Sequence, residues 1–180
     1  MKKRKLVGLI TSFPESIHAQ RVLEGVFVQC NKYGYDVAVF ASMVNISSFY
    51  KEYLKGEANI YELINYDLLD GVIVDGSTLT EGNETIYIER IREELESRCD
   101  KPVISLNIPV GSYEVLENHD SDIFKDIVEH VVDVHQVKDV YFLTGTKGHP
   151  IAEDRLRVCL ESMQERNLSV SEEQIYYGDF

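Results

Sequence analysis

Short apolar runs alternate along the chain with longer stretches in which apolar residues recur at helical spacing. The runs are bounded by loop-forming residues and predict strands at residues 5–10, 35–42, 71–76, 102–107, 139–145 and 174–179. Helices are predicted between them, at residues 16–33, 46–69, 85–98, 122–134 and 151–167. This alternating order is typical of parallel sheets with helices on both faces, so we predict a doubly wound α/β fold.

Two glycines mark expected breaks in the helices. Gly34 follows the first predicted helix, and glycine is the usual residue just beyond a helix C-terminus because it readily adopts a positive φ. Gly56 is expected to interrupt the second helical stretch. The apolar spacing of that stretch predicts a buried face made of Tyr50, Leu54, Tyr61, Leu63 and Ile64.

The pattern of elements changes after the fourth predicted strand. Residues 108–120 contain Pro109 and Gly111 and are predicted to form a crossover. Four strand–helix units precede this segment and two begin after it. We therefore predict a first lobe at residues 1–110, with the crossover and the beginning of a second lobe at residues 111–180.

The chain is acidic, with 31 Asp and Glu against 18 Lys and Arg and a net charge of −13. A phosphate backbone repels such a charge, so we expect no nucleic-acid binding through this segment. The cysteines, Cys30, Cys99 and Cys159, show no CxxC spacing, which disfavours a disulfide framework or a zinc site. Reduced thiols, and a first apolar run too short for a signal peptide or a membrane span, lead us to expect a cytoplasmic protein without membrane contact.

Candidate ligand-binding residues follow the predicted strands, because ligands of open parallel sheets bind where the carboxyl ends of the strands meet. Asp75 and Asn107 end the third and fourth strands, and both can accept hydrogen bonds from a hydroxylated ligand. His18 and His149 lie in strand-to-helix loops at this edge, and Arg155 lies in the helix after the second loop. Each residue also has a structural explanation, as a turn former, a helix cap or an exposed helix residue, and both interpretations stay open.

Enzyme and metal signatures are weak. The loop GTKGHP at residues 145–150 does not satisfy the phosphate-loop pattern, and it is either a tight turn or a nest of amides for an oxyanion. No G-x-S-x-G nucleophile elbow occurs. The histidines show no HExxH spacing, and His130 and His135 lie five residues apart around a helix end, so we expect surface positions and no metal.

In order and spacing, five segments resemble the effector-binding domain of LacI/GalR-type regulators, which has the two-lobed type I periplasmic-binding-protein fold. The segments span nearly the whole chain, at residues 7–40, 66–77, 101–107, 128–145 and 152–180. In that family the two lobes close around a small ligand, often a sugar, that binds between them. The resemblance therefore implies a small-molecule effector as partner, no cofactor, and a regulatory domain rather than an enzyme.

The resemblance also implies which residues bind the ligand. The family binds with the loop after the first strand, the ends of the third and fourth strands and an arginine on a second-lobe helix, positions that match Ser16, Ile17, His18, Asp75, Asn107 and Arg155. Two pairs depart from the family pattern, His119-Asp120 and Val158-Cys159. The family precedent further implies a homodimer through first-lobe helices at residues 16–33 and 46–66.

The chain ends in IYYGDF, a strand and a turn, where the family continues through the rest of its second lobe. We therefore expect these residues to be part of a longer protein, with the second lobe incomplete here. Residues 55–79 and 155–180 look most like sensor domains fused to diguanylate cyclase (GGDEF) modules, with AraC-type DNA-binding or histidine-kinase outputs close behind.

Two alternatives to a sensor stay open. The chain could serve only as a dimerisation or interaction module that binds no ligand. It could also be an enzyme on a flavodoxin-like scaffold, with Asp75 or His149 as acid or base. The second alternative has less support, because no nucleophile and base occur at a recognisable spacing.

Overall fold

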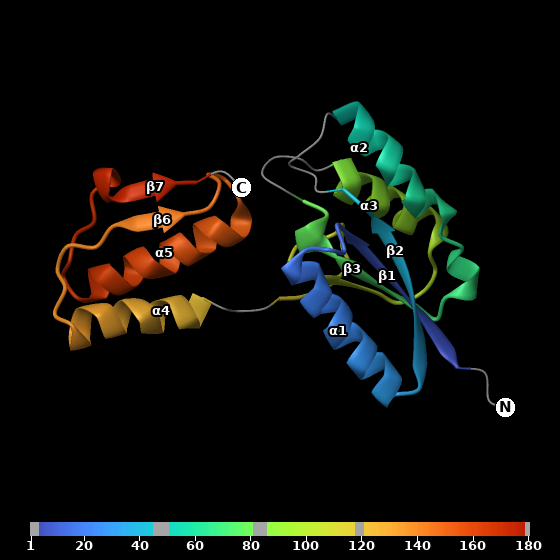
Figure 1. The fold of residues 1–180 in the computed structure, drawn as a ribbon, viewed down its shortest axis with the longest axis horizontal. Helices are drawn as coiled ribbons and strands as arrows, with labels where there is room; N and C mark the ends of the chain where they lie inside the picture. Colours follow the sequence, from blue (N-terminus) through green and yellow to red (C-terminus); the bar gives the residue numbers. More distant parts are fainter. Residues whose placement is uncertain (1–3, 45–50, 81–85, 118–120, 179–180) are drawn as a thin grey trace. The chain divides into compact units, whose positions relative to one another are not determined.

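The computed structural model describes residues 4–44, 51–80, 86–117 and 121–178. They belong to two compact units, Met1–Asn118 and His119–Phe180. The first unit is a five-stranded parallel sheet with helices, and the second is a two-stranded parallel sheet with helices (Figure 1). The predicted α/β fold with parallel sheets is confirmed.

The sheet of the first unit has the strand order β2-β1-β3-β4-β5. In its centre, Leu9 of β1 lies opposite Val39 of β2 and Ile73 of β3. The strands all run in the same direction, so their carboxyl ends share one edge. The strands are β1 (Lys5–Ser12), β2 (Tyr35–Ser42), β3 (Gly71–Asp75), β4 (Val103–Leu106) and β5 (Glu114–Leu116).

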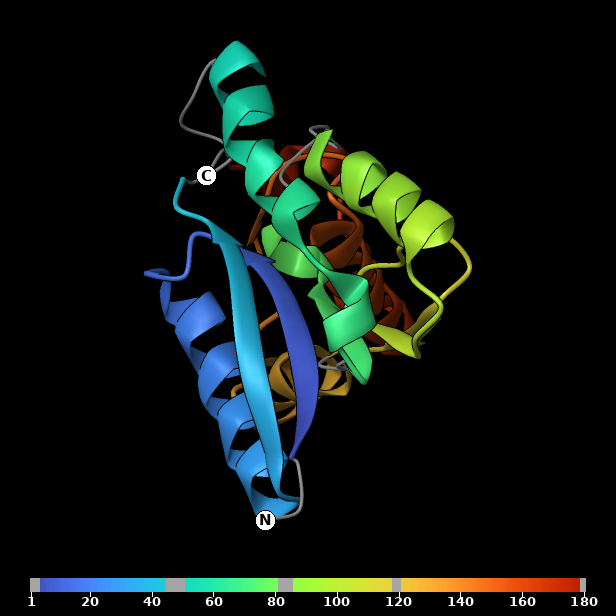
Figure 2. The same ribbon diagram turned by 90° about the vertical axis from the view of Figure 1, so that its right-hand side faces the viewer.

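Helices cover both faces of this sheet. As Figure 2 shows, α1 (Ile17–Lys32) lies on one face, and α2 (Lys51–Glu57) and α3 (Ile86–Arg98) lie on the other. Two short 3-10 helices, Ala58–Leu63 and Tyr66–Leu68, connect α2 to β3. Because each helix follows its strand, the loops between them emerge at the carboxyl edge of the sheet, where the candidate residues lie.

The first helix begins and ends where its sequence predicts. The Ser16 side chain accepts a hydrogen bond from the Ala19 amide at 3.1 Å, which satisfies one of the amides left open in the first turn. Gly34 follows the last turn with a φ of 74°, a conformation that glycine adopts without strain. These two residues fix the length of α1 and the position of the loop that carries His18.

The larger core lies between the sheet and the face covered by α2 and α3. Ile10 and Val74 of the sheet belong to it, together with Tyr61, Tyr87 and Ile91 from the covering segments. The rings of Tyr61 and Tyr87 meet edge to face, with their centroids 5.6 Å apart. Such a pair adds stability beyond the burial of its apolar surface.

Two details of the stretch before β3 differ from the sequence prediction. Gly56 does not interrupt α2, which continues through it before the backbone tightens into a 3-10 helix. Ile64 is buried as predicted, whereas Leu63 is 74% exposed, because it lies two residues from the buried Tyr61 and so about 240° away from it around a 3-10 helix. Tyr50 of that predicted face lies outside the described residues, and Leu54 and Tyr61 are buried as predicted.

The segment predicted as a crossover contributes a strand instead. β5 pairs in parallel with β4, and Val115 lies opposite Ser105. The pairing places residues 111–117 with the first unit. The division between the two units falls after Asn118, within the segment 108–120 predicted as the crossover between the lobes.

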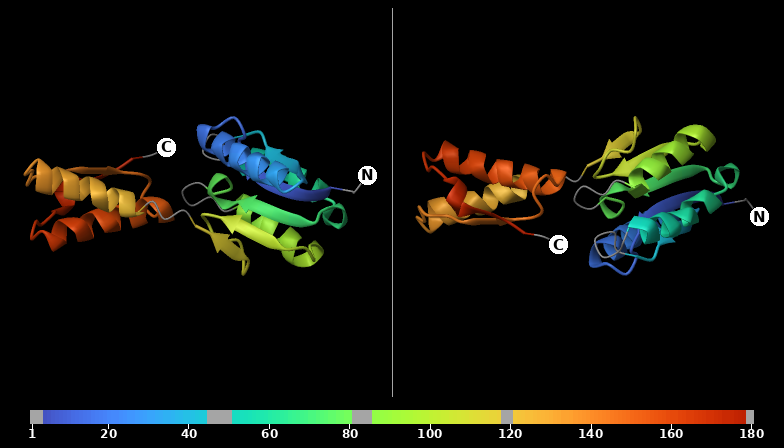
Figure 3. Two further views of the ribbon diagram at one scale, coloured as in Figure 1. Left: turned by 90° about the horizontal axis from the view of Figure 1, so that it is seen from below. Right: turned by 90° about the horizontal axis from the view of Figure 1, so that it is seen from above.

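The second unit packs two helices together beside two strands. The helices α4 and α5 lie side by side (Figure 3), and Val128 of the first shares a small core with Cys159 and Met163 of the second. Where a regular helix is predicted through residue 134, α4 gives way to one π-helical turn, His130–Val134. The elements are α4 (Ser121–Glu129), β6 (Phe142–Thr144), α5 (Pro150–Glu165) and β7 (Ile175–Tyr177).

Candidate functional site

Polar side chains gather at the carboxyl edge of the first-unit sheet. Five of them are buried with at most 1% of their surface exposed, namely Thr11, Ser12, Ser42, Asp75 and Ser105. Buried polar groups destabilise a fold unless they are hydrogen-bonded, so a cluster of this kind needs a network. The partners of Asp75 show how the network is made.

Asp75 ends β3 and is held almost entirely by hydroxyl groups. Its Oδ1 accepts a hydrogen bond from the Ser77 hydroxyl at 2.7 Å, and its Oδ2 accepts one from the Thr11 hydroxyl at 3.3 Å. Its backbone carbonyl accepts a third from the Thr78 hydroxyl at 3.0 Å. The turn Gly76–Thr78 folds the Ser77 hydroxyl back onto the carboxylate and the Thr78 hydroxyl back onto the backbone carbonyl of Asp75.

Gly76 makes this turn possible. A Cβ at this position would lie 2.6 Å from the carbonyl oxygen of Ile108, closer than such atoms approach. The chain after β4 therefore packs directly against the backbone of the turn. Ser105 reinforces this contact, because its hydroxyl donates a hydrogen bond to the same Ile108 carbonyl.

His18 reaches the cluster from the first turn of α1. Its Nε2 lies 2.8 Å from the Ser77 hydroxyl and 3.8 Å from Oδ1 of Asp75. The Asp75 carboxylate raises the pKa of His18 above its usual value, first through this polar contact and also through its charge, and partial burial of the ring opposes the rise. About half of the His18 side chain is exposed, so the ring can meet a ligand.

The direction of these hydrogen bonds matters for the chemistry. Ser77 has one hydroxyl proton, and the buried carboxylate of Asp75 is the stronger acceptor for it. Nε2 of His18 must then carry the proton in its contact with Ser77. A catalytic serine needs the opposite arrangement, with its proton donated to the histidine. The geometry is that of a hydrogen-bonding surface and not of an activated nucleophile.

Two buried tyrosines hold the neighbouring strand ends. The Tyr61 hydroxyl donates to the Thr11 carbonyl at 2.8 Å and accepts from the Ser42 amide at 3.3 Å. The Tyr87 hydroxyl lies 3.0 Å from the Ser42 hydroxyl. Burial raises the pKa of both phenols, so both stay neutral and hydrogen-bonded. The edge is thus fixed before any ligand arrives.

The other first-unit candidates have separate surroundings. Ser16 uses its hydroxyl to cap α1, and Ile17 is 81% exposed. Asn107 follows β4 with a φ of 63°, a left-handed conformation that asparagine tolerates better than most residues, and its backbone N–H donates to the Leu116 carbonyl. Two of the first-unit candidates, His18 and Asp75, are joined by hydrogen bonds through Ser77.

The remaining candidates lie in the second unit. His149 directly precedes α5, and its carbonyl accepts the Glu153 amide at 3.0 Å. The carboxylate of Glu153 accepts a hydrogen bond from the Gly148 amide at 2.8 Å, so one amide of the possible anion nest already binds a side chain of this protein. The Arg155 guanidinium lies 5.1 Å from the ring centroid of Phe124 on α4, in a cation–π contact.

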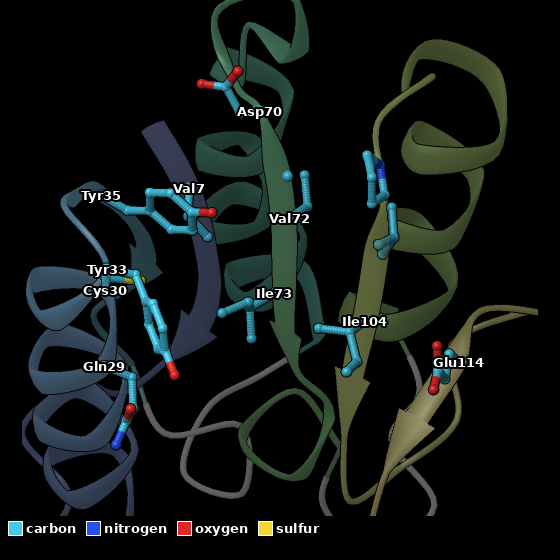
Figure 4. A pocket seen from close by; sticks show the side chains of 13 residues that line it. Val7, Gln29, Cys30, Tyr33, Tyr35, Asp70, Val72, Ile73, Ile104 and Glu114 are labelled. Atoms are coloured by element: carbon cyan, nitrogen blue, oxygen red, sulfur yellow. The ribbon is translucent and has the colours of Figure 1, made fainter. Parts of the chain in front are cut away.

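A hollow of about 420 Å³ lies elsewhere, on the α1 side of the sheet toward the amino ends of the strands. Figure 4 shows Tyr33 and Tyr35 beside it and Val7, Ile73 and Ile104 of the sheet along it. Its lining is mostly apolar. The predicted polar site and this hollow therefore occupy different ends of the sheet.

The described residues hold neither a cluster of three metal-binding side chains nor a membrane-spanning helix. No three His, Cys, Asp or Glu side chains within the described residues converge as metal ligands. None of the helices in the described ranges has both the length and the apolar character needed to cross a membrane. His119 and Asp120, the pair that departs from the family pattern, lie outside the described residues.

Solved structures match the fold over nearly the whole chain. CcpA of Lactococcus lactis matches 99% of it with a TM-score of 0.69 and 19% identity. A sugar-binding LacI-family regulator from Escherichia coli complexed with phosphate matches 99% of it, with a TM-score of 0.64 and 13% identity. A periplasmic binding protein/LacI transcriptional regulator from Alkaliphilus metalliredigens complexed with D-xylulofuranose matches 98% of it, with a TM-score of 0.63 and 13% identity. The chain has the fold of LacI-family regulators and periplasmic binding proteins.

The match covers only part of each of these structures. The chain spans 60%, 60% and 56% of their respective lengths, which agrees with the predicted incomplete second lobe. No protein-family model matches the sequence, and a search of curated proteins finds no match either. The structural likeness establishes the fold predicted from the five sequence segments.

Proposed function

We propose that this chain is the sensing part of a LacI-like regulator and binds a small polyhydroxylated molecule, such as a sugar, at the carboxyl edge of the first-unit sheet. One observation carries the proposal: the hydrogen-bonded chain from Asp75 through Ser77 to the half-exposed ring of His18. It joins a buried acceptor to an exposed donor at the edge where ligands of parallel sheets bind.

The chemistry of the edge favours a neutral ligand with several hydroxyl groups. Carboxylate, hydroxyl and imidazole groups there can all exchange hydrogen bonds with alcohols. The net charge of −13 disfavours a strongly anionic ligand. Among the matching structures, one holds D-xylulofuranose and another is described as sugar-binding, which supports a sugar as the ligand class.

The second unit supplies further proposed contacts. His149 and Arg155 are proposed to meet the ligand from the start of α5, as Ser16, Ile17 and Asn107 are from the first unit. Arg155 is suited to this role because a guanidinium presents several donors in one plane. The bound state would be read by an output module outside these 180 residues, and the sequence resemblance favours a C-terminal diguanylate cyclase.

The test is a thermal-shift screen of pentoses, hexoses and nucleosides with matched serine variants. A ligand that binds the folded state raises the melting temperature. We expect Ser77→Ala to reduce that shift, because it breaks the link between Asp75 and His18, and Ser97→Ala on the exposed face of α3 to leave it unchanged. The proposal fails if no compound stabilises the protein while a sugar-binding protein of this fold responds in the same screen.

A homodimer is the second proposed property of this chain. Phe27 and Val28 are exposed large apolar residues on α1, one of the two helices for which the sequence predicts a dimer face. Tyr53 and Leu63 are exposed in the other segment of that predicted face. Apolar residues on such a surface gain stability when a second copy covers them.

A further inference from the structure

The end of α4 brings two imidazole rings together. The π-helical turn His130–Val134 is closed by a hydrogen bond from the His135 amide to the His130 carbonyl, five residues apart. Their Nε2 atoms lie 3.1 Å apart. In a regular α-helix, residues five apart point about 140° away from each other. The π turn is therefore what makes the two side chains neighbours, and such turns are frequent at functional sites.

The distance between the nitrogens suits two ligands of one metal ion. Zn–N bonds are about 2.0–2.1 Å long, so two nitrogens on one ion lie about 2.9 Å apart at a right angle and about 3.3 Å apart at the tetrahedral angle. The observed separation of His130 Nε2 and His135 Nε2, 3.1 Å, falls between these limits. The side chains need little rearrangement to chelate an ion.

The orientation of the rings agrees with the same conclusion. Two rings whose Nε2 atoms both point at one ion have centroids about 4.8 Å apart at this nitrogen separation, whereas an in-line N–H···N hydrogen bond separates them by about 5.4 Å. The centroids of the His130 and His135 rings are 4.8 Å apart, with the ring planes at 80°. The centroid separation is the one expected for rings that share an ion, and without an ion the same arrangement allows a bent hydrogen bond between the two nitrogens.

The surroundings favour a cation. The pair lies at the C-terminal end of a helix, where carbonyl groups without helical partners give a negative potential. Both histidines are exposed, so an ion and its water ligands can reach them. Two acidic side chains of the same segment, Glu129 and Asp133, form ion pairs with Arg166. Their carboxylate oxygens lie 3.1 and 2.9 Å from its guanidinium nitrogen, so the proposed site does not include them.

We propose that His130 and His135 form a chelating site for a borderline divalent transition-metal ion, such as Zn²⁺, Ni²⁺ or Cu²⁺, with water in the remaining positions. Imidazole nitrogen is a preferred ligand of these ions. Both rings bind through Nε2 and carry their proton on Nδ1 in the loaded site. Two protein ligands make the site weaker than a structural zinc site with four. The site is independent of the proposed ligand-binding edge.

The test is a calorimetric titration of the tag-free chain with NiCl₂ and with ZnCl₂. We expect one ion per chain, and we expect His130→Gln and His135→Gln each to weaken binding about tenfold or more, because each leaves a single imidazole. Lys138→Gln is the matched control, since it introduces the same side chain at another exposed position of the same unit, and it should keep the wild-type affinity. Circular dichroism checks that each variant is folded.

Long-range ¹H–¹⁵N NMR spectra supply a second measurement. Saturating Zn²⁺ should shift the Nε2 signals of His130 and His135 together and leave those of His18 and His149 in place. Equal affinity of the wild type and both Gln variants would overturn the site, as would Zn²⁺-induced shifts at other histidines only. Failure of the sugar screen would not affect this result, because the two readouts involve different residues.

Discussion

The Ser77 hydroxyl donates its proton to Oδ1 of Asp75 at 2.7 Å and lies 2.8 Å from Nε2 of His18. A buried carboxylate at the end of β3 is thereby connected to a ring on the surface of α1. The connection makes the protonation of His18, the stability of the first unit and the proposed binding of a ligand depend on one another. Each of these dependences can be measured.

The stability of the first unit should fall as the pH rises through the pKa of His18. A raised folded-state pKa means that the protonated ring stabilises the fold. This contribution is fully present below the unfolded pKa near 6.5 and is lost as the pH rises through the higher pKa of the folded state. The effect is small because the ring is half exposed and salt screens it. Urea unfolding of the wild type and His18→Gln from about pH 6 to about pH 9 isolates the contribution. A difference between them that grows with pH would contradict it.

Asp75→Asn should destabilise the protein by about 1–3 kcal/mol, because the new amide group faces a hydroxyl donor and leaves one buried hydrogen bond unmade. Asp36→Asn is the matched control. Its carboxylate pairs with Arg4 on the surface, where such a pair contributes about 1 kcal/mol or less. Urea midpoints for the two variants decide the matter. Equal losses of stability in the two variants would mean that the buried hydrogen bonds of Asp75 stabilise the fold no more than a surface ion pair does.

Two glycine-to-alanine substitutions should have opposite effects. Gly76→Ala places a methyl group 2.6 Å from the Ile108 carbonyl and should destabilise the protein by about 1–3 kcal/mol. Gly25→Ala lies within α1, where the added methyl group meets no atom within 4 Å apart from its chain neighbours and the helix's own backbone, and it should stabilise the protein by up to about 1 kcal/mol. Thermal unfolding measures both. A tolerated Gly76→Ala would show that the turn after β3 can move away from β4.

Charge on the exposed face of α1 should weaken self-association. Val28→Asp buries a carboxylate in the proposed dimer contact, whereas Ser97→Asp adds the same charge on α3, outside the proposed contact. Sedimentation equilibrium should give a dimer for the wild type and Ser97→Asp, and a larger fraction of monomer for Val28→Asp. A wild type that is monomeric at all concentrations, or a dimer indifferent to Val28→Asp, excludes this face.

The sequence predicted the edge that carries His18 and Asp75 because apolar runs and capping residues act locally. Ser16 caps α1 by accepting a hydrogen bond from the Ala19 amide, three residues along the chain. The strand Gly71–Asp75 ends at its only acidic residue. Such signals need no knowledge of the rest of the chain.

The features that the sequence analysis missed depend on helix type and on short pairings. His130 meets His135 because the helix ends in a π turn, and this contact does not follow the 3.6-residue period used for prediction. Leu63 lies about 200° from Tyr61 even on a regular α-helix, so its predicted burial did not fit that period. The β5 strand is three residues long and too short for a recognisable pattern. Ser77 carries no sequence signal of its own, because its link between Asp75 and His18 requires the turn at Gly76.

An NMR titration with the strongest stabilising sugar tests the central claim most directly. The account predicts that shifts of the His18 ring and of the amides of Thr11, Ser77 and Thr78 saturate together, and that Ser77→Ala weakens the binding. Saturating shifts confined to the hollow beside Tyr33, Tyr35 and Ile104 would contradict it, because the ligand would then occupy the other end of the sheet.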